Sequence, residues 1–137
     1  ERSATNPHGQ WFMFGLVEQT FPGMDYLWDA AANRARCPKT TALVESIEGI
    51  TDAGFSLLLP RTHLLPHRGL EPHLLRAHLC MHIPEGEVRL ACGGFERSYR
   101  NGDAYVFDDL YLHDARNDAD DLRVVLLICF ERAVYGL

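Results

Sequence analysis

The chain has 137 residues, of which 47% are hydrophobic and 23% are charged, and its formal net charge is -6. This length supports one domain with a single core, and the composition is that of a folded globular protein rather than a disordered one. The negative net charge argues against nucleic acid as a partner, because binding to phosphate backbones depends on clustered Lys and Arg.

No apolar run approaches the ~20 residues that a membrane helix requires, and no signal-peptide pattern opens the sequence, so we expect no membrane segment in this chain. Four cysteines are spread along the chain without a C-x-x-C pair, which argues against a zinc knuckle or a dithiol redox motif. A chain of this size does not need disulfides for stability, so the cysteines favour a reducing, cytoplasmic location.

The N-terminal part of the sequence predicts a strand followed by one helix. Residues 10–17 are rich in aromatic and aliphatic side chains and read as a flanking strand. Pro22 precedes good helix formers over residues 25–36, with acid early and base late, which complements the helix dipole. We expect this helix to end before Pro38.

From about Ala53 onward the pattern changes to short β-type runs separated by turn residues, which is typical of a sandwich or barrel. The runs cover residues 54–59, 74–83, 88–92, 95–99, 104–107 and 123–130. Asn101-Gly102 is a strong hairpin signal between two of them. We therefore predict a single, mostly β domain over residues 1–137, in which a β core (53–137) follows a flanking strand and helix (1–52).

Alternation within the run 74–83 separates an apolar set from a polar set of side chains. The apolar set comprises Leu75, Ala77, Leu79, Met81 and Ile83, and the polar set comprises Arg76, His78, Cys80 and His82. Because successive strand residues point to opposite faces, we expect the apolar set to pack in the core and the polar set to meet something polar.

Seven histidines occur in the sequence, and five of them lie between residues 63 and 82. Histidine is the commonest metal ligand, but any one histidine taken alone is better explained as a surface residue or a hydrogen-bonded core residue. His67 stands where an extended segment turns, so its side chain can point into a barrel mouth. His113 follows 46 residues later, and Arg123 ten residues beyond that. A guanidinium there could grip a carboxylate through two parallel hydrogen bonds.

Four blocks of sequence carry a resemblance to a known family. They are Phe55-Ser-Leu-Leu-Leu-Pro-Arg-Thr-His-Leu-Leu-Pro-His-Arg-Gly69, Leu75-Arg-Ala-His-Leu79, Val106-Phe-Asp-Asp-Leu-Tyr-Leu-His113 and Arg123-Val-Val-Leu126. In these blocks the chain resembles the aspartyl/asparaginyl β-hydroxylases, from about residue 54 to 131 and more faintly around residues 11–28. The resemblance implies a double-stranded β-helix (a cupin-like jelly roll) and an Fe(II)- and 2-oxoglutarate-dependent dioxygenase that uses O2.

The resemblance also assigns a metal site. It implies that His67 and His113 hold the iron. Gly69 stands where many such enzymes carry the carboxylate of a two-histidine, one-carboxylate triad, a gap that the family shares. Asp109 matches an acid that could hold a water at the open position, although a solvated turn residue explains it equally well from sequence.

The remaining family positions concern the co-substrate. The resemblance implies that Ser56 and Arg123 bind the distal carboxylate of 2-oxoglutarate. It implies that Arg76 and His78 contact its other end and that Leu58 lines the same pocket.

Leu74 carries the expectation about the substrate. The hydroxylases typically read Arg-Leu-Arg before the position that matches His78, and the first Arg helps to hold the acidic side chain of the substrate. This chain reads Leu74-Leu75-Arg76 instead, so a buried substrate carboxylate would lack its partner. We therefore expect hydroxylation of an unactivated C–H in a small-molecule or amino-acid-derived substrate, with an Asp or Asn β-carbon kept as an option.

Two alternatives stay open from the sequence. The same iron chemistry could give desaturation, cyclisation or halogenation, because the outcome depends on where the substrate carbon lies. A cupin-like module that binds a metal or small molecule without catalysis is the second alternative, but such a module has no need for Arg123 in register with Ser56.

Overall fold

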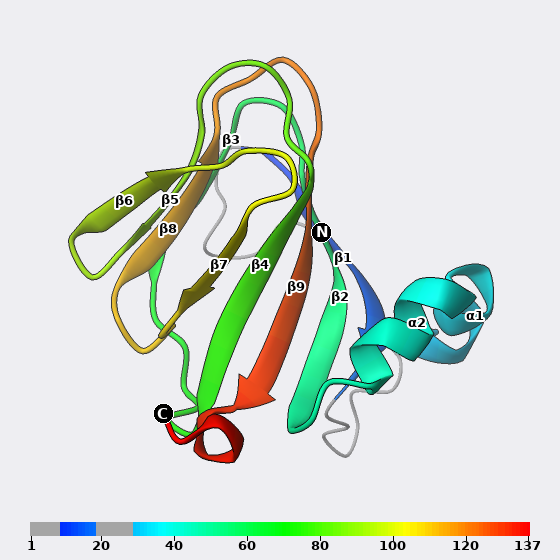
Figure 1. Ribbon diagram of the computed structural model, residues 1–137. Helices are drawn as coiled ribbons and strands as arrows, with labels where there is room; N and C mark the ends of the chain where they lie inside the picture. Colours follow the sequence, from blue (N-terminus) through cyan, green and yellow to red (C-terminus); the bar gives the residue numbers. More distant parts are fainter. Residues whose placement is uncertain (1–8, 19–28) are drawn as a thin grey trace.

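The computed structural model describes residues 9–18 and 29–137, and within them it shows a mostly β fold with two helices (Figure 1). The strands are β1 (Trp11–Val17), β2 (Ile50–Leu58), β3 (Thr62–His67), β4 (Leu74–His82), β5 (Val88–Cys92), β6 (Phe95–Ser98), β7 (Ala104–Phe107), β8 (His113–Asn117) and β9 (Arg123–Glu131). The helices are α1 (Ala30–Arg36) and α2 (Pro38–Glu45), and a short 3-10 helix, η1 (Arg132–Tyr135), follows β9. No helix among these residues has the length and hydropathy needed to cross a membrane.

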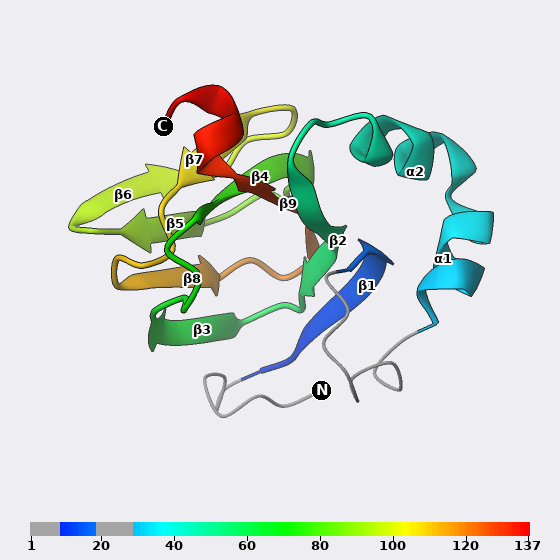
Figure 2. The same cartoon turned by 90° about the horizontal axis from the view of Figure 1, so that it is seen from below.

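The strands form two antiparallel sheets that face each other (Figure 2). The large sheet has the order β1-β2-β9-β4-β7, and the small sheet has the order β3-β8-β5-β6. The chain passes from one sheet to the other between β2 and β3 and again at most later connections, which is the winding of a jelly roll. The interior faces of the two sheets therefore enclose the core.

The central strand β9 shows why these residues form this sheet. Its sequence is rich in Val, Leu and Ile, and it pairs with β2 on one side and β4 on the other. A strand that is covered on both faces reads as a nearly continuous apolar run. Its charged residues stand only at the two ends: Glu131 is exposed, whereas Arg123 points into the interior.

The main core lies between the sheets, and a smaller cluster lies outside the large sheet. The main cluster consists of Leu58, Leu64, Cys80, Ile83, Val88, Leu90, Tyr99, Ala115, Ala119 and Val125. In the outer cluster, Val44 of α2 packs on Ala53 and Leu126. The helices thus cover part of the outer face of β1, β2 and β9 (Figure 2).

The flanking strand β1 and most core runs agree with the sequence prediction, but the faces of β4 are reversed. The polar set is the more buried one: His78 is 6% exposed and Cys80 is 2% exposed. Met81, which was expected in the core, is 48% exposed. Arg76, His78 and Cys80 point to the inside of the barrel, whereas Leu79 packs outward against the cluster beneath α2. After the irregularity between Cys80 and His82 the pattern shifts, so that His82 is exposed and Ile83 lies in the core.

Three elements differ from the sequence prediction. Strands β3 and β8 lie outside the predicted β runs. The sequence of β8, His-Asp-Ala-Arg-Asn, does not show the apolar pattern of a strand, because its buried positions are partly polar. The predicted helix is seen from Ala30, and its residues 25–28 lie outside the described part of the chain. The predicted helix ends before Pro38, as expected, but Pro38 then begins a second helix that the sequence did not predict; a proline at the first helical position gives up no hydrogen bond.

Candidate active site

Adjacent strands of the large sheet bring the predicted co-substrate residues onto one interior face. In the antiparallel register Leu58 of β2 lies opposite Arg123 of β9, and Ser56 lies opposite Val125. On the other side of β9, His78 of β4 pairs with Leu127. Residues two apart on a strand share a face, so Ser56, Arg123 and His78 all point into the barrel.

Arg123 is a buried cation with free hydrogen-bonding capacity. Its side chain is among the fully buried ones, and the residue is 2% exposed. One nitrogen, Nη2, donates to Ser56 Oγ over 3.3 Å, while Nε and Nη1 have no hydrogen-bond partner within the described residues. Burial lowers the pKa of this guanidinium from its ordinary value. Because unpaired buried donors are costly, this arrangement fits an anion that completes the site.

Ser56 is held from the far side by Trp11 of β1. The indole Nε1 of Trp11 donates to Ser56 Oγ over 3.0 Å. The hydroxyl oxygen therefore accepts from both Trp11 and Arg123, and its own hydrogen is left to donate into the cavity. Sequence reasoning placed Trp11 only in a flanking strand, and its faint family match there was the one signal for a role in the site.

His67 and His113 lie directly opposite each other on β3 and β8 of the small sheet. Their ring centroids are 4.2 Å apart. Nδ1 of His67 donates to the Leu65 carbonyl over 2.7 Å, and Nδ1 of His113 donates to the Tyr111 carbonyl over 2.9 Å. Since a carbonyl oxygen can only accept, these bonds place the hydrogen on Nδ1 and leave the Nε2 lone pair of each ring for a metal.

The environment of His113 favours its neutral, metal-binding form. Desolvation is the largest cause that lowers the pKa of His113, and the nearby His67 and Arg76 lower it further. Within residues 9–18 and 29–137, no group of three or more His, Cys, Asp or Glu side chains is arranged to hold a metal. The two facing imidazoles, each with a free Nε2 lone pair, are the metal donors that the described residues offer here.

His78 faces the same cavity from the large sheet. Its Nδ1 lies 2.5 Å from the hydroxyl of Tyr99, and its Nε2 is buried without a hydrogen-bond partner among the described residues. Desolvation lowers the pKa of His78 well below its ordinary value, and the charges of Arg123 and Arg76 add to this effect. Burial and the neighbouring cations thus favour the neutral form of His78.

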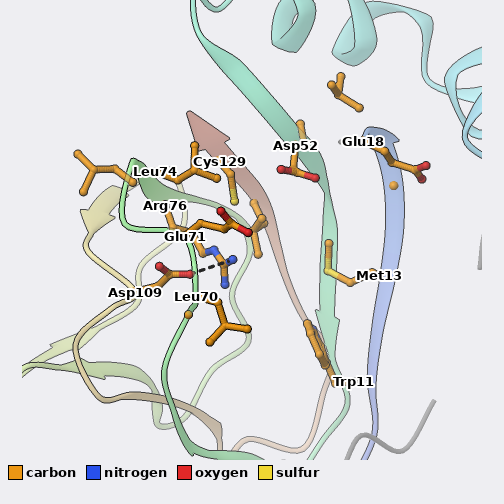
Figure 3. Close-up of a pocket in the computed structure, with 16 residues that line it drawn as sticks. Trp11, Met13, Glu18, Asp52, Leu70, Glu71, Leu74, Arg76, Asp109 and Cys129 are labelled. Atoms are coloured by element: carbon orange, nitrogen blue, oxygen red, sulfur yellow. Dashed lines mark ion pairs between the residues drawn. The ribbon is translucent and has the colours of Figure 1, made fainter. Parts of the chain in front are cut away.

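Asp109 occupies the space beside Gly69. Its carboxylate accepts an ion pair from Arg76 over 3.0 Å, and the Gly69 amide donates to its backbone carbonyl over 2.7 Å (Figure 3). A Cβ added at residue 69 would overlap the Asp109 carboxylate. A carboxylate thus lies beside the position from which other two-histidine sites supply their third ligand, although it comes from the loop before β8.

The site consists of a small inner cavity and a larger outer groove. The inner cavity, of about 40 Å³, is lined by Trp11, Ser56, Leu64, His67, Arg76, His78, Leu90, Phe107, His113, Ala115, Arg123 and Leu127. The groove, of about 390 Å³, shares Trp11, Arg76 and Leu127 with that cavity. Its further apolar lining includes Met13, Leu70 and Leu74 (Figure 3).

The structure gathers most of the predicted site residues in these two spaces. Leu74 and Asp109 line the groove, whereas the predicted ligand and co-substrate residues line the inner cavity. Leu58 is the exception, because its side chain is 0% exposed in the main core cluster and lines neither space. Phe107 and Tyr99, which sequence reasoning did not assign to the site, contact the His78 ring edge-on.

Fold and cavity together define a jelly-roll protein of the cupin type with a polar chamber inside the barrel. A likeness in fold is seen with the cupin domain of Schizosaccharomyces pombe Cnp3 (TM-score 0.52, 6% identity, 66% of this chain and 63% of that one). A structure described as a predicted oxalate decarboxylase from Thermotoga maritima is similar (TM-score 0.51, 14% identity, 61% and 68%). These likenesses confirm the predicted fold class.

The chain belongs to the aspartyl/asparaginyl beta-hydroxylase family, which it matches over residues 1–133. It is 41% identical over 100 residues to the ornithine lipid ester-linked acyl 2-hydroxylase of Rhizobium tropici, covering 72% of this chain and 36% of that protein. It is 29% identical over 128 residues to the aspartyl/asparaginyl beta-hydroxylase of Mus musculus, covering 88% and 16%. The chain thus spans about a third or less of the length of these hydroxylases.

Proposed function

We propose that this chain is an Fe(II)- and 2-oxoglutarate-dependent dioxygenase domain that hydroxylates an unactivated C–H bond. The observation that carries the proposal is the buried Arg123 guanidinium, two of whose nitrogens have no partner among residues 9–18 and 29–137, in a cavity that it shares with His67 and His113. A binding module without oxidative chemistry gives no reason to bury an unpaired cation beside two histidines with free lone pairs.

In this proposal His67 and His113 hold Fe(II). When bound, the iron supplies the O2-dependent oxidising chemistry that protein side chains lack. The protein contributes ligand orientation through the two Nδ1–carbonyl hydrogen bonds, which fix both rings and their tautomers. The Asp109 carboxylate, held by Arg76, can accept a hydrogen bond from water at the cavity edge.

The co-substrate would be held at both ends. The Arg123 fork and the Ser56 hydroxyl bind one carboxylate of 2-oxoglutarate, while His78 and Arg76 meet the other end. The dicarboxylate also offsets the charge of the metal and of Arg123, which the described side chains leave unpaired. Apolar side chains from the small sheet, among them Leu64 and Leu90, line the cavity and limit access of water.

For the substrate we propose an apolar acyl chain. The groove is predominantly apolar and continues into the inner cavity through Trp11 and Leu127. Leu74 lies in its wall, at the position where the resemblance associates a cation with an acidic substrate. The relative from Rhizobium tropici is named for hydroxylation of an ester-linked acyl group, which agrees with this lining. A substrate carboxylate would meet acidic side chains of the groove, among them Asp52 and Glu71, and the Arg76 guanidinium there already pairs with Asp109.

The co-substrate proposal is tested by anaerobic titration of Fe(II) and 2-oxoglutarate, followed through the visible charge-transfer band. We expect the wild-type chain to develop the band, His67→Ala and His113→Ala to abolish it, and Arg123→Ala to require far more co-substrate. Arg97→Ala is a matched control, because Arg97 is exposed on β6. Absence of the band in the wild type would refute the catalytic assignment.

The substrate proposal is tested with acylated amino acids of short and long chain, by following succinate release. Leu70, which is 88% exposed at the groove, should contact only the longer chains. Leu70→Ser should then lower kcat/KM for long chains by roughly tenfold, since burial of one leucine is worth about 1.5–3 kcal/mol. Leu43→Ser on α2 is the control, with a leucine 70% exposed away from the groove. Equal losses for both chain lengths would contradict an acyl groove.

A further inference from the structure

The hydrogen bond between His78 and Tyr99 determines which nitrogen His78 presents to the cavity. Tyr99 lies one residue beyond β6, is 5% exposed, and reaches across the interior to His78 on β4. Its hydroxyl lies 2.5 Å from His78 Nδ1. Within the described residues this is the one hydrogen bond that the Tyr99 hydroxyl makes.

Two tautomers of a neutral His78 are compatible with this distance. If Nδ1 carried the hydrogen, it would donate to Tyr99, and the phenol hydrogen would then lack an acceptor in a buried position. If Nε2 carries the hydrogen, the Tyr99 phenol donates to Nδ1 of His78, so that the phenol hydrogen and the Nδ1 lone pair are paired with each other. The first arrangement leaves two buried groups unpaired, the phenol hydrogen and the Nε2 lone pair, whereas the second leaves only the Nε2 hydrogen unpaired among the described residues. Because each unpaired buried group costs about 1–3 kcal/mol, the second arrangement is favoured.

The cavity side of the ring agrees with this assignment. Nε2 of His78 has no protein partner among the described residues, and it lines the chamber together with Arg76 and Arg123. A hydrogen on Nε2 makes His78 a third donor toward an anion there. The other tautomer would aim a lone pair at a carboxylate, which is repulsive.

Tyr99 is itself held rigidly. Its ring stacks on that of Tyr105, with centroids 5.4 Å apart and planes at 15°, and its backbone amide donates to the Val88 carbonyl over 2.8 Å. Tyr105 is anchored in turn, because its hydroxyl lies 3.0 Å from both the Ser98 carbonyl and Asp103 Oδ2. The phenol of Tyr99 is therefore fixed before any ligand arrives.

We propose that Tyr99 is a positioning residue, which fixes the tautomer of His78 so that its Nε2–H donates to a carboxylate of the 2-oxo dicarboxylate in the chamber. This inference rests on the proposed function for the identity of the ligand. The geometry of the His78–Tyr99 pair stands independently of it.

The test uses Tyr99→Phe, which keeps the ring and its stacking but removes the hydroxyl. In the ligand-free chain labelled with 15N-histidine, long-range 1H–15N spectra distinguish protonated from unprotonated ring nitrogens, and His78→Gln identifies the His78 signals. We expect the wild type to show hydrogen on Nε2 of His78 and Tyr99→Phe to show a mixture of tautomers. A wild-type spectrum with hydrogen on Nδ1, or an unchanged spectrum in Tyr99→Phe, would overturn the proposal.

The binding arm measures the Kd of 2-oxoglutarate in the Fe(II)-loaded chain under anaerobic conditions. Tyr99→Phe should raise the Kd by roughly tenfold, the effect of one hydrogen bond to a charged group. Tyr135→Phe, which removes a hydroxyl from a half-exposed tyrosine of η1 that lines neither the cavity nor the groove, should leave it unchanged. In a His78→Gln background, where the amide nitrogen donates without help from the phenol, Tyr99→Phe should have no further effect.

The two arms separate the possible failures. An equal loss of affinity from Tyr99→Phe in both backgrounds would show that the hydroxyl acts through general packing, and would overturn the positioning role. A wild type that shows the expected tautomer but binds no 2-oxoglutarate would overturn the proposed function and the ligand named here, while the tautomer assignment would stand on the spectra.

Discussion

Replacing Arg123 by Met should make the ligand-free chain more stable while abolishing its affinity for 2-oxoglutarate. The Arg123 side chain is fully buried, and one 3.3 Å hydrogen bond to Ser56 is its only hydrogen bond among the described residues. Replacing buried charges with apolar groups raises the free energy of unfolding by about 1–4 kcal/mol, and the lost hydrogen bond offsets about 1 kcal/mol of this. Ser56 keeps Trp11 as a donor, so no new unsatisfied group arises.

We therefore expect a net gain of up to about 3 kcal/mol, or a rise in Tm of up to about 10 °C for a domain of this size. Thermal unfolding followed by circular dichroism, with and without Fe(II) and 2-oxoglutarate, measures both effects. Ligand at about 100 times its Kd should stabilise the wild type by about 2.7 kcal/mol and leave Arg123→Met unchanged.

The exposed Arg97 on β6 provides the matched control, because Arg97→Met should change the stability by less than about 0.5 kcal/mol. If ligand-free Arg123→Met melts below the wild type, the reasoning that Arg123 is an uncompensated charge kept for ligand binding is refuted.

Two further predictions concern the loop before β8. Gly69→Ala should lower the free energy of unfolding by about 1–3 kcal/mol, because the new methyl group overlaps the Asp109 carboxylate. In an Asp109→Ala background this loss should largely disappear. Equal losses in both backgrounds, measured by urea unfolding, would exclude the clash as the cause. The hydrogen bond from Arg132 lowers the pKa of Asp108 in the folded chain below its ordinary value of 3.8. The stability that this pair contributes is therefore fully present above pH 3.8, and it is lost as the pH falls through the pKa of Asp108 in the folded chain. The difference in unfolding free energy between wild type and Asp108→Asn should accordingly shrink from about pH 6 to about pH 3, and a difference that is independent of pH would contradict the assignment.

The spacing of His67, His113 and Arg123, read together with the family resemblance, predicted three residues that the structure places in one cavity. Spacing was informative because each residue lies at the end of a strand, where the register of the neighbouring strand fixes its position. The roles of these residues toward iron and 2-oxoglutarate stay predictions until the titration above is made.

The orientation of β4 could not be read from its alternation. A period of two separates the faces of a strand, but it does not say which face is inside when both are covered. Here the polar face, with His78, encloses the chamber, and the apolar face, with Leu79, packs toward α2. A polar strand face inside a barrel is itself a sign of a functional interior, because buried polar groups need partners.

Tyr99 and Trp11 were missed for a different reason. Each acts on a residue far away in sequence: Trp11 donates to Ser56, and Tyr99 bonds His78. Contacts between distant segments depend on strand order, which the local pattern of side chains does not encode.

The position of β9 has a consequence for how the domain folds. Among the described strands β9 comes last in sequence, yet it lies in the middle of the large sheet, between β2 and β4. Until it is inserted, the facing edges of β2 and β4 have no pairing partner, and both are templates for wrong association. Such late, non-local closure slows folding and lengthens the exposure of these edges during synthesis. The strand that carries Arg123 is therefore also the one whose insertion protects the chain from aggregation.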